Sequence, residues 1–179
     1  KIEKFFFASS SSVYGNLNPH SYFHEELKTD KPVSFYAATK KSNEIIAHSY
    51  SKLYNLKLVG LRFFTVYGPF GRPDMAYYKF TKKILNNQTI DLYNNGNHIR
   101  DFTYIDDVIN SILLLDKNFK KINSNFEIFN IGASMPVSLK TFIKTIEKNL
   151  GKRAKIKKIP FQRGDVIGTK ASIAKLKKI

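Results

Sequence analysis

The sequence has no cysteine, which excludes disulfide bonds, thiolate metal ligands and catalysis by a thiol. Its four histidines lack the spacing of a zinc site, so we expect no metal. It also has no signal peptide and no apolar run of about 18 residues. These absences predict a soluble, cytoplasmic protein that is not bound to a membrane.

Acidic residues are scarce: 14 Asp and Glu stand against 30 Lys and Arg, for a net charge of +16. Such a charge is typical of proteins that bind nucleic acid or anionic membranes. Here the charge is mostly lysine and is scattered along the chain, with one dense stretch at residues 152–158. We therefore expect no nucleic-acid partner. A non-catalytic remnant or basic module that contacts nucleic acid or an acidic polymer remains the alternative.

Apolar patterning predicts alternating strands and helices. The expected strands are residues 2–8, 58–64, 89–93, 101–105, 125–131 and 154–159, and the expected helices are residues 34–54, 75–85, 106–115 and 138–150. The first strand, the long helix and the second strand form a βαβ unit, which requires a parallel sheet with a right-handed crossover. Ser34 and Ser138 are suited to cap the helices that follow them.

A glycine-rich G-x-x-G-x-x-G loop is also missing from the sequence. Such a loop, with its helix amino terminus, is what normally holds a dinucleotide pyrophosphate. The chain starts on an apolar strand and stops within what resembles the start of a helix. We therefore expect a fragment that binds a dinucleotide poorly and is inactive as given.

The most informative residues are Tyr36 and Lys40, which are four positions apart and share one face of the predicted helix. An ammonium close to a phenol favours the phenolate. A serine hydroxyl from the run Ser10-Ser11-Ser12, after the first strand, would complete a base able to take a proton from an alcohol. This is the proton half of a hydride-transfer reaction.

Five motifs in order make the sequence resemble the extended short-chain dehydrogenase/reductase family, and within it the NAD-dependent nucleotide-sugar epimerases and dehydratases. The motifs are residues 8–15 (Ala-Ser-Ser-Ser-Ser-Val-Tyr-Gly), Tyr36-x-x-x-Lys40, residues 62–69 (Arg-Phe-Phe-Thr-Val-Tyr-Gly-Pro), residues 100–107 (Arg-Asp-Phe-Thr-Tyr-Ile-Asp-Asp) and Gly164-Asp165. The resemblance covers nearly the whole chain.

The resemblance implies an α/β fold: the C-terminal part of a Rossmann-like doubly wound parallel sheet, plus a small α/β substrate-binding subdomain. Residues 1–70 would be the remaining part of the NAD-binding domain. Residues 71–100 and 132–179 would bind the nucleotide sugar, and residues 101–131 would return to the Rossmann sheet. It further implies NAD as cofactor, a UDP-sugar as substrate, a homodimer in the complete protein and a role in polysaccharide biosynthesis.

Residues 65–76 (Thr-Val-Tyr-Gly-Pro-Phe-Gly-Arg-Pro-Asp-Met-Ala) are most similar to the UDP-glucuronate 4-epimerases. A sugar carboxylate needs hydroxyl donors and a cation, which Ser11, Ser12, Thr65 and Arg72 would supply. Arg72 as a solvated loop residue is the alternative. Epimerases of UDP-glucose or UDP-N-acetylglucosamine, or a related dehydratase, also remain open. Dehydratases, however, carry Asp-Glu where Ser11 and Ser12 stand.

The resemblance also assigns roles. Ser10, Tyr36 and Lys40 align with the catalytic residues, and Tyr36 would act as acid and base while Lys40 holds the nicotinamide ribose. Phe63 would belong to the core or pack on the nicotinamide. Ser10 would also contact the sugar, Arg100 the pyrophosphate and Asp165 a ribose, although a loop-capping role suits Asp165 nearly as well.

Overall fold

The computed structural model describes residues 2–162 and 164–179. Its helices and strands are β1 (Phe5–Ser10), α1 (Phe35–Tyr54), β2 (Leu58–Phe63), β3 (Thr65–Tyr67), α2 (Ala76–Leu85), β4 (Thr89–Leu92), β5 (Ile99–Tyr104), α3 (Ile105–Lys117), β6 (Phe126–Ile131), β7 (Pro136–Ser138), α4 (Leu139–Leu150) and β8 (Lys155–Lys158). Short 3-10 turns cover Ser11–Tyr14, Tyr93–Gly96, Phe119–Lys121 and Leu176–Lys178. Within the described ranges, each helix is too short or too polar to span a bilayer.

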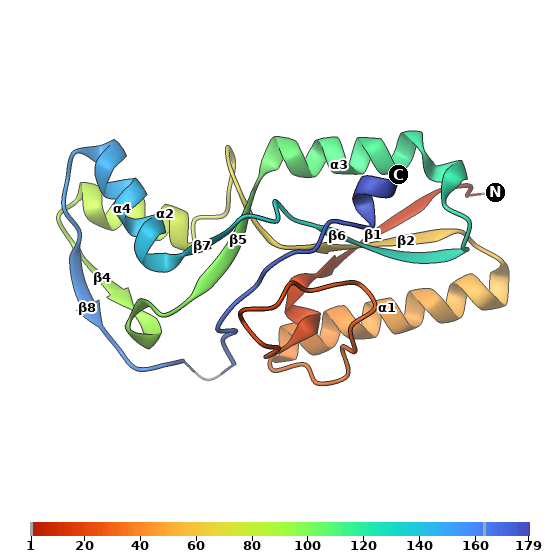
Figure 1. Cartoon of the computed structure of the whole chain (residues 1–179), viewed down its shortest axis with the longest axis horizontal. Helices are drawn as coiled ribbons and strands as arrows, with labels where there is room; N and C mark the ends of the chain where they lie inside the picture. The colour runs from red at the N-terminus through yellow and green to blue at the C-terminus, as the bar shows by residue number, and fades with distance from the viewer. Residues whose placement is uncertain (1, 163) are drawn as a thin grey trace.

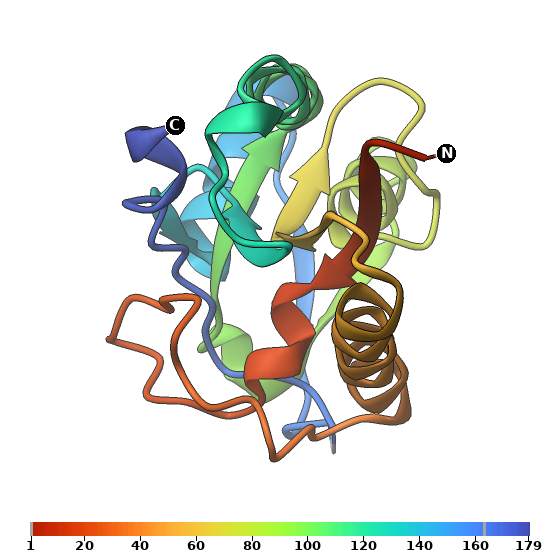
Figure 2. The same ribbon diagram turned by 90° about the vertical axis from the view of Figure 1, so that its right-hand side faces the viewer.

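The central sheet has the order β1-β2-β6, and both of its strand pairs are parallel. Helix α1 lies on one face and α3 on the other, as Figures 1 and 2 show. This is the doubly wound arrangement that the sequence predicts, so the expected α/β class with a Rossmann-like sheet is confirmed.

The two faces of the sheet are packed differently. On the α3 side, alternate strand residues such as Val59, Leu61 and Phe129 form an apolar core with Val108 and Leu115. The other face receives α1, whose buried residues are Ala37, Glu44 and Ser51. Their spacing of seven residues places them on one stripe of the helix. A carboxylate in the middle of that stripe must be paired, because burying an isolated charge is costly.

A second sheet, β3-β5-β7, continues from the carboxyl end of the first. The chain leaves the central sheet at Phe64 and enters β3, which pairs in parallel with β5. Residues 101–131, which the sequence analysis assigns to the Rossmann sheet, contribute strands to both sheets. Strand β6 pairs with β2, whereas β5 belongs to the second sheet, because its other neighbour is the antiparallel β7.

The small α/β unit at the left of Figure 1 contains β4, β8, α2 and α4. Strands β4 and β8 pair in parallel, and Ile90, Leu92 and Ile143 form a separate apolar core. How the chain divides into functional domains stays a prediction.

Local signals explain the ends of the main helices. The Ser34 side chain accepts a hydrogen bond from the Ala37 amide at 3.1 Å and begins α1. Ser138 does the same for α4 through the Thr141 amide, also at 3.1 Å. Asn55 and Gly151 end these helices in the left-handed conformation, which both residues tolerate. The predicted caps are confirmed, and most predicted boundaries lie within two residues of those observed.

Candidate functional site

The carboxyl ends of β1 and β2 open into a cavity of about 600 Å³ beside the first turns of α1. Eight residues singled out from the sequence line it: Ser10, Ser11, Ser12, Tyr36, Lys40, Phe63, Thr65 and Arg72. We call this the reactive cavity. It lies where open parallel sheets usually bind their ligands.

Tyr36 and Lys40 are placed by the Ser34 cap, which fixes the start of α1. Tyr36 is 53% exposed, so its phenol is accessible from the cavity. The Lys40 ammonium lies 5.8 Å from the centre of the Tyr36 ring. It donates a hydrogen bond to the Ala8 carbonyl oxygen at 3.1 Å. An ammonium has three donors, so Lys40 can hold the strand end and a ligand hydroxyl together.

Ser10 ends β1 and caps the 3-10 turn that follows it. Its Oγ accepts from the Ser12 amide at 3.1 Å and lies 3.2 Å from the Ser12 hydroxyl. These contacts turn the chain so that three consecutive serines border one cavity. Several hydroxyl groups are thus available to a polar ligand near Tyr36.

Arg72 is at the exposed rim of the reactive cavity. Its Nε and Nη2 donate to the two carboxylate oxygens of Asp74 at 3.0 and 2.5 Å. Hydrogen bonding to Arg72 lowers the pKa of Asp74. Exposed ion pairs of this kind contribute little to stability, so the guanidinium can exchange Asp74 for another carboxylate.

Gly68 shapes the same rim. Its φ of 141° suits glycine, and a Cβ there would lie 2.5 Å from Cγ2 of Ile105. The turn after β3 can therefore approach the start of α3 closely only with glycine at this position.

Arg100 and Asp165 lie in a second cavity, of about 850 Å³, and not with Tyr36. We call it the outer cavity. The Arg100 Nη2 donates to Asp165 Oδ1 at 2.9 Å, and Arg100 Nη1 donates to the carbonyl oxygens of Ile99 and Ile167. Asp74 lines this outer cavity while its partner Arg72 lines the reactive one. The Arg72–Asp74 pair therefore marks the boundary between the two.

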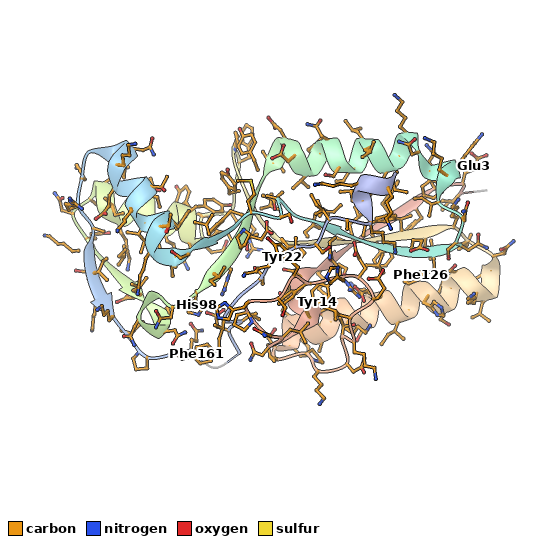
Figure 3. The ribbon with its side chains drawn as sticks, viewed as in Figure 1. Glu3, Tyr14, Tyr22, His98, Phe126 and Phe161 are labelled. Atoms are coloured by element: carbon orange, nitrogen blue, oxygen red, sulfur yellow. The ribbon has the colours of Figure 1, made fainter. Side chains whose placement is uncertain are left out.

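His98 is an additional residue of the outer cavity. It is 4% exposed, and its Nε2 lies 3.1 Å from Asp165 Oδ2. Its ring stacks with that of Phe161, with 6.3 Å between the ring centroids; both residues are labelled in Figure 3. Burial and the neighbouring Arg100 charge lower the pKa of His98. From the sequence, His98 was considered only as one of four histidines that lack the spacing of a zinc site, and no role was predicted for it. Across the described ranges, no three His, Asp or Glu side chains gather closely enough to hold a metal ion.

A buried polar network behind the reactive cavity was not foreseen. Glu44 of α1 accepts hydrogen bonds from Ser9 and Arg62, and the Tyr14 hydroxyl donates to Asn130 at 2.8 Å. Burial raises the pKa of Tyr14 to about 12, so it stays a neutral donor. The available signal was Arg62, a charge inside the apolar run of β2, which requires a buried partner.

Comparisons with known proteins agree with this geometry. The family model described as the NAD dependent epimerase/dehydratase family matches residues 1–132. An uncharacterized protein of Methanocaldococcus jannaschii is 54% identical over 99% of this chain and 53% of its own length. UDP-glucuronate 4-epimerase 4 of Arabidopsis thaliana is 48% identical over 93% of this chain and 41% of its own.

Among solved structures, the UDP-glucuronic acid 4-epimerase of Bacillus cereus, in complex with UDP-glucuronic acid and NAD, is similar with a TM-score of 0.90. The two sequences are 36% identical, and the match covers 99% of this chain and 55% of the other. The chain spans about half the length of the curated relatives it matches.

Proposed function

The chain belongs to the NAD dependent epimerase/dehydratase family, and we propose that its gene product inverts C4 of UDP-glucuronate through a transient 4-keto sugar. One observation carries this proposal. Ser10, Tyr36 and Lys40 line the reactive cavity, and that cavity meets the outer one at the Arg72–Asp74 pair. A nucleoside diphosphate sugar has the same two-part form, with a reacting sugar and an anionic nucleotide.

The proton chemistry is assigned to Tyr36. Tyr36, beside the Lys40 ammonium, takes the proton from the sugar 4-hydroxyl. Ser10 hydrogen-bonds the same oxygen and keeps it oriented. After the keto sugar turns over, Tyr36 returns the proton to O4, and C4 is inverted because the hydride comes back to its other face. The reaction is redox-neutral, because the hydride taken from C4 is given back.

Two residues near the reactive cavity suit the nicotinamide end of NAD. The Lys40 ammonium, which already bonds the Ala8 carbonyl, has further donors for ribose hydroxyls. Phe63 supplies an apolar surface in the same cavity. When bound, NAD accepts and returns the hydride.

The identity of the sugar is inferred from the residues at the rim of the reactive cavity. Arg72, with Ser11, Ser12 and Thr65, offers a cation and hydroxyl groups to a carboxylate at C6. Arg100 in the outer cavity would meet the pyrophosphate, and Asp165 a ribose hydroxyl. Such a reaction would supply uronate precursors for polysaccharide synthesis. We place the protein in the cytoplasm.

A homodimer is part of the same proposal. Helix α1 carries exposed apolar residues that an interface would cover: Ile45, Ile46, Tyr50, Leu53 and Tyr54. Large apolar side chains gathered on one helix are typical of association surfaces.

The test is turnover by the complete gene product with UDP-glucuronate and NAD, followed by NMR of the sugar protons. We expect the C4 epimer to accumulate to an equilibrium ratio without net NADH. Conversion of UDP-glucose but not UDP-glucuronate would overturn the sugar assignment. No epimer from any UDP-sugar would overturn the proposed function.

A further inference from the structure

The Glu44 carboxylate lies one helical turn after Lys40 on α1, in the buried polar network behind the reactive cavity. It is 4% exposed and accepts three hydrogen bonds from the side chains of Ser9 and Arg62. The Ser9 hydroxyl donates to Oε1 at 2.6 Å, and Arg62 Nε and Nη2 donate to Oε1 and Oε2 at 2.8 and 2.9 Å. The pair with Arg62 is thus bidentate, the geometry that fixes position as well as charge.

These partners lie in one row across the central sheet. Ser9 pairs in register with Arg62, and Arg62 with Asn130. Each is one residue before the end of its strand, where Ser10, Phe63 and Ile131 stand. The row therefore lies directly behind the strand ends that form the reactive cavity.

The same row is anchored further into the molecule. The Arg62 guanidinium stacks over the Tyr14 ring, 4.7 Å from its centre, and Nη1 donates to the Glu25 carbonyl oxygen at 3.2 Å. Tyr14, labelled in Figure 3, follows the serine turn and bonds Asn130. Asn130 in turn donates to the carbonyl oxygens of Phe23 and Ser172. These contacts fix the position of Arg62 and therefore that of the Glu44 carboxylate.

We propose that Glu44, held by Arg62 and Ser9, is a positioning residue that sets the distance between α1, which carries Tyr36 and Lys40, and Ser10 at the end of β1. This inference rests on the proposed function. Tyr36 is on α1 and Ser10 is on β1, so proton transfer depends on how the helix is seated on the strand. The Lys40–Ala8 hydrogen bond is a second link between the two elements, but it lies at the exposed cavity edge.

The network also explains why a charge is buried at this point. Burial opposes ionisation of Glu44, but the hydrogen bonds and charge of Arg62 outweigh it and keep the pKa of Glu44 below its usual value. A buried ion pair contributes little net stability compared with apolar residues of similar volume. Its directional hydrogen bonds are what an apolar pair could not replace.

The difference between directional hydrogen bonds and apolar contacts provides the test, which uses the complete gene product. Glu44→Leu with Arg62→Met replaces the pair by apolar side chains, which is often neutral for stability. We expect kcat to fall about 10²-fold, the cost of a small misplacement of reacting groups, with KM for UDP-glucuronate within about twofold. Ser9→Ala removes one hydrogen bond, leaves the ion pair intact and should lower kcat in the same way but less.

Lys41→Ala is the matched control. The Lys41 ammonium lies 3.5 Å from the same carboxylate but belongs to the same helix as Glu44, so it does not tie α1 to the sheet. This variant should keep the wild-type kcat. Wild-type kcat in both the double variant and Ser9→Ala would overturn the inference. If the double variant does not fold, the kcat values of Ser9→Ala and Ser9→Thr test the inference. We expect Ser9→Thr, which keeps the hydroxyl, to have the wild-type kcat.

A second readout separates this inference from the proposed function. Hydrogen exchange of the amides at residues 37–43 can be followed in the 179-residue chain without any turnover. We expect faster exchange there in the double variant at equal global stability; unchanged exchange would overturn the positioning role. A wild-type protein without turnover would overturn the proposed function, and hydrogen exchange would still test the positioning role.

Discussion

Arg100 and Asp165, 65 positions apart in the chain, meet with 2.9 Å between Nη2 and Oδ1 in the outer cavity. Burial lowers the pKa of Arg100, and the Asp165 carboxylate opposes this effect. A diphosphate entering the cavity would compete with Asp165 for the same guanidinium. Under the proposed function, the pair would hold Arg100 in place for an incoming diphosphate.

We expect Arg100→Ala to weaken UDP binding by the 179-residue chain about 10–100-fold, the value of hydrogen bonds to a charged group. Isothermal titration calorimetry measures this directly. Arg153→Ala is the matched control, because it removes the same charge from a side chain that is 92% exposed. Equal losses in the two variants would mean that only the overall positive charge attracts UDP.

Tyr36→Phe should lower kcat of the complete gene product about 10²–10⁴-fold, the usual contribution of general acid–base catalysis. UDP-glucuronate should still bind, because the phenol is assigned to proton transfer and not to nucleotide recognition. Steady-state kinetics and calorimetry separate the two effects. Tyr50→Phe, an exposed tyrosine on the same helix, should leave kcat unchanged. Near wild-type turnover in Tyr36→Phe would contradict the assignment.

Arg72→Ala should reduce kcat/KM for UDP-glucuronate about 10–100-fold, since it removes a charge-assisted contact to the sugar carboxylate. UDP-glucose, which has no carboxylate, serves as the control substrate and should lose much less. The competing Asp74 contact gives a second comparison: Asp74→Asn should keep the preference for UDP-glucuronate. If Arg72→Ala affects both sugars equally, Arg72 does not read the carboxylate.

The Glu44–Arg62 pair predicts a specific pH dependence of stability. The folded pKa of Glu44 lies below its usual value, which is about 4.3 for an unfolded chain. The stabilisation is therefore fully present above about pH 4.3 and is lost as the pH falls through the folded pKa. Glu44→Gln should lower the free energy of unfolding by about 3–5 kcal/mol at pH 7 and by less in acid.

Urea denaturation at a series of pH values checks this prediction. Asp116→Asn is the control, because Asp116 pairs with Lys4 at a half-exposed site and should change stability by about 1 kcal/mol or less. A difference between wild type and Glu44→Gln that does not change with pH would show that the Glu44 charge is not what stabilises the fold.

Much of the fold could be predicted from local patterns. The strands at β1, β2 and β6 are short apolar runs, and the Ser34 and Ser138 caps mark the start of α1 and α4. Periodicity and capping depend on residues within a few positions of each other, so one sequence suffices to find them. Strand β3, which directly follows the predicted strand at residues 58–64, was missed, because only its pairing with β5 reveals it.

The candidate site was partly predictable for the same reason. Ser10, Tyr36 and Lys40 are recognisable from spacing and motif order, and they do line one cavity. Their roles stay predictions. The placement of Arg100 and Asp165 in a separate cavity, and the pairing of Arg72 with Asp74, depend on side-chain directions that no local pattern specifies.

The sequence by itself determined the α/β class, the order of strands and helices, and the chemical groups available for proton transfer, because these follow from local periodicity and residue type. The tertiary structure alone decided which distant groups meet. Glu44, Arg62 and Ser9 come from three separate elements: parallel strand register aligns Ser9 with Arg62, and the packing of α1 on the sheet brings Glu44 to both. Register is a property of the assembled sheet, set by the packing of both its faces.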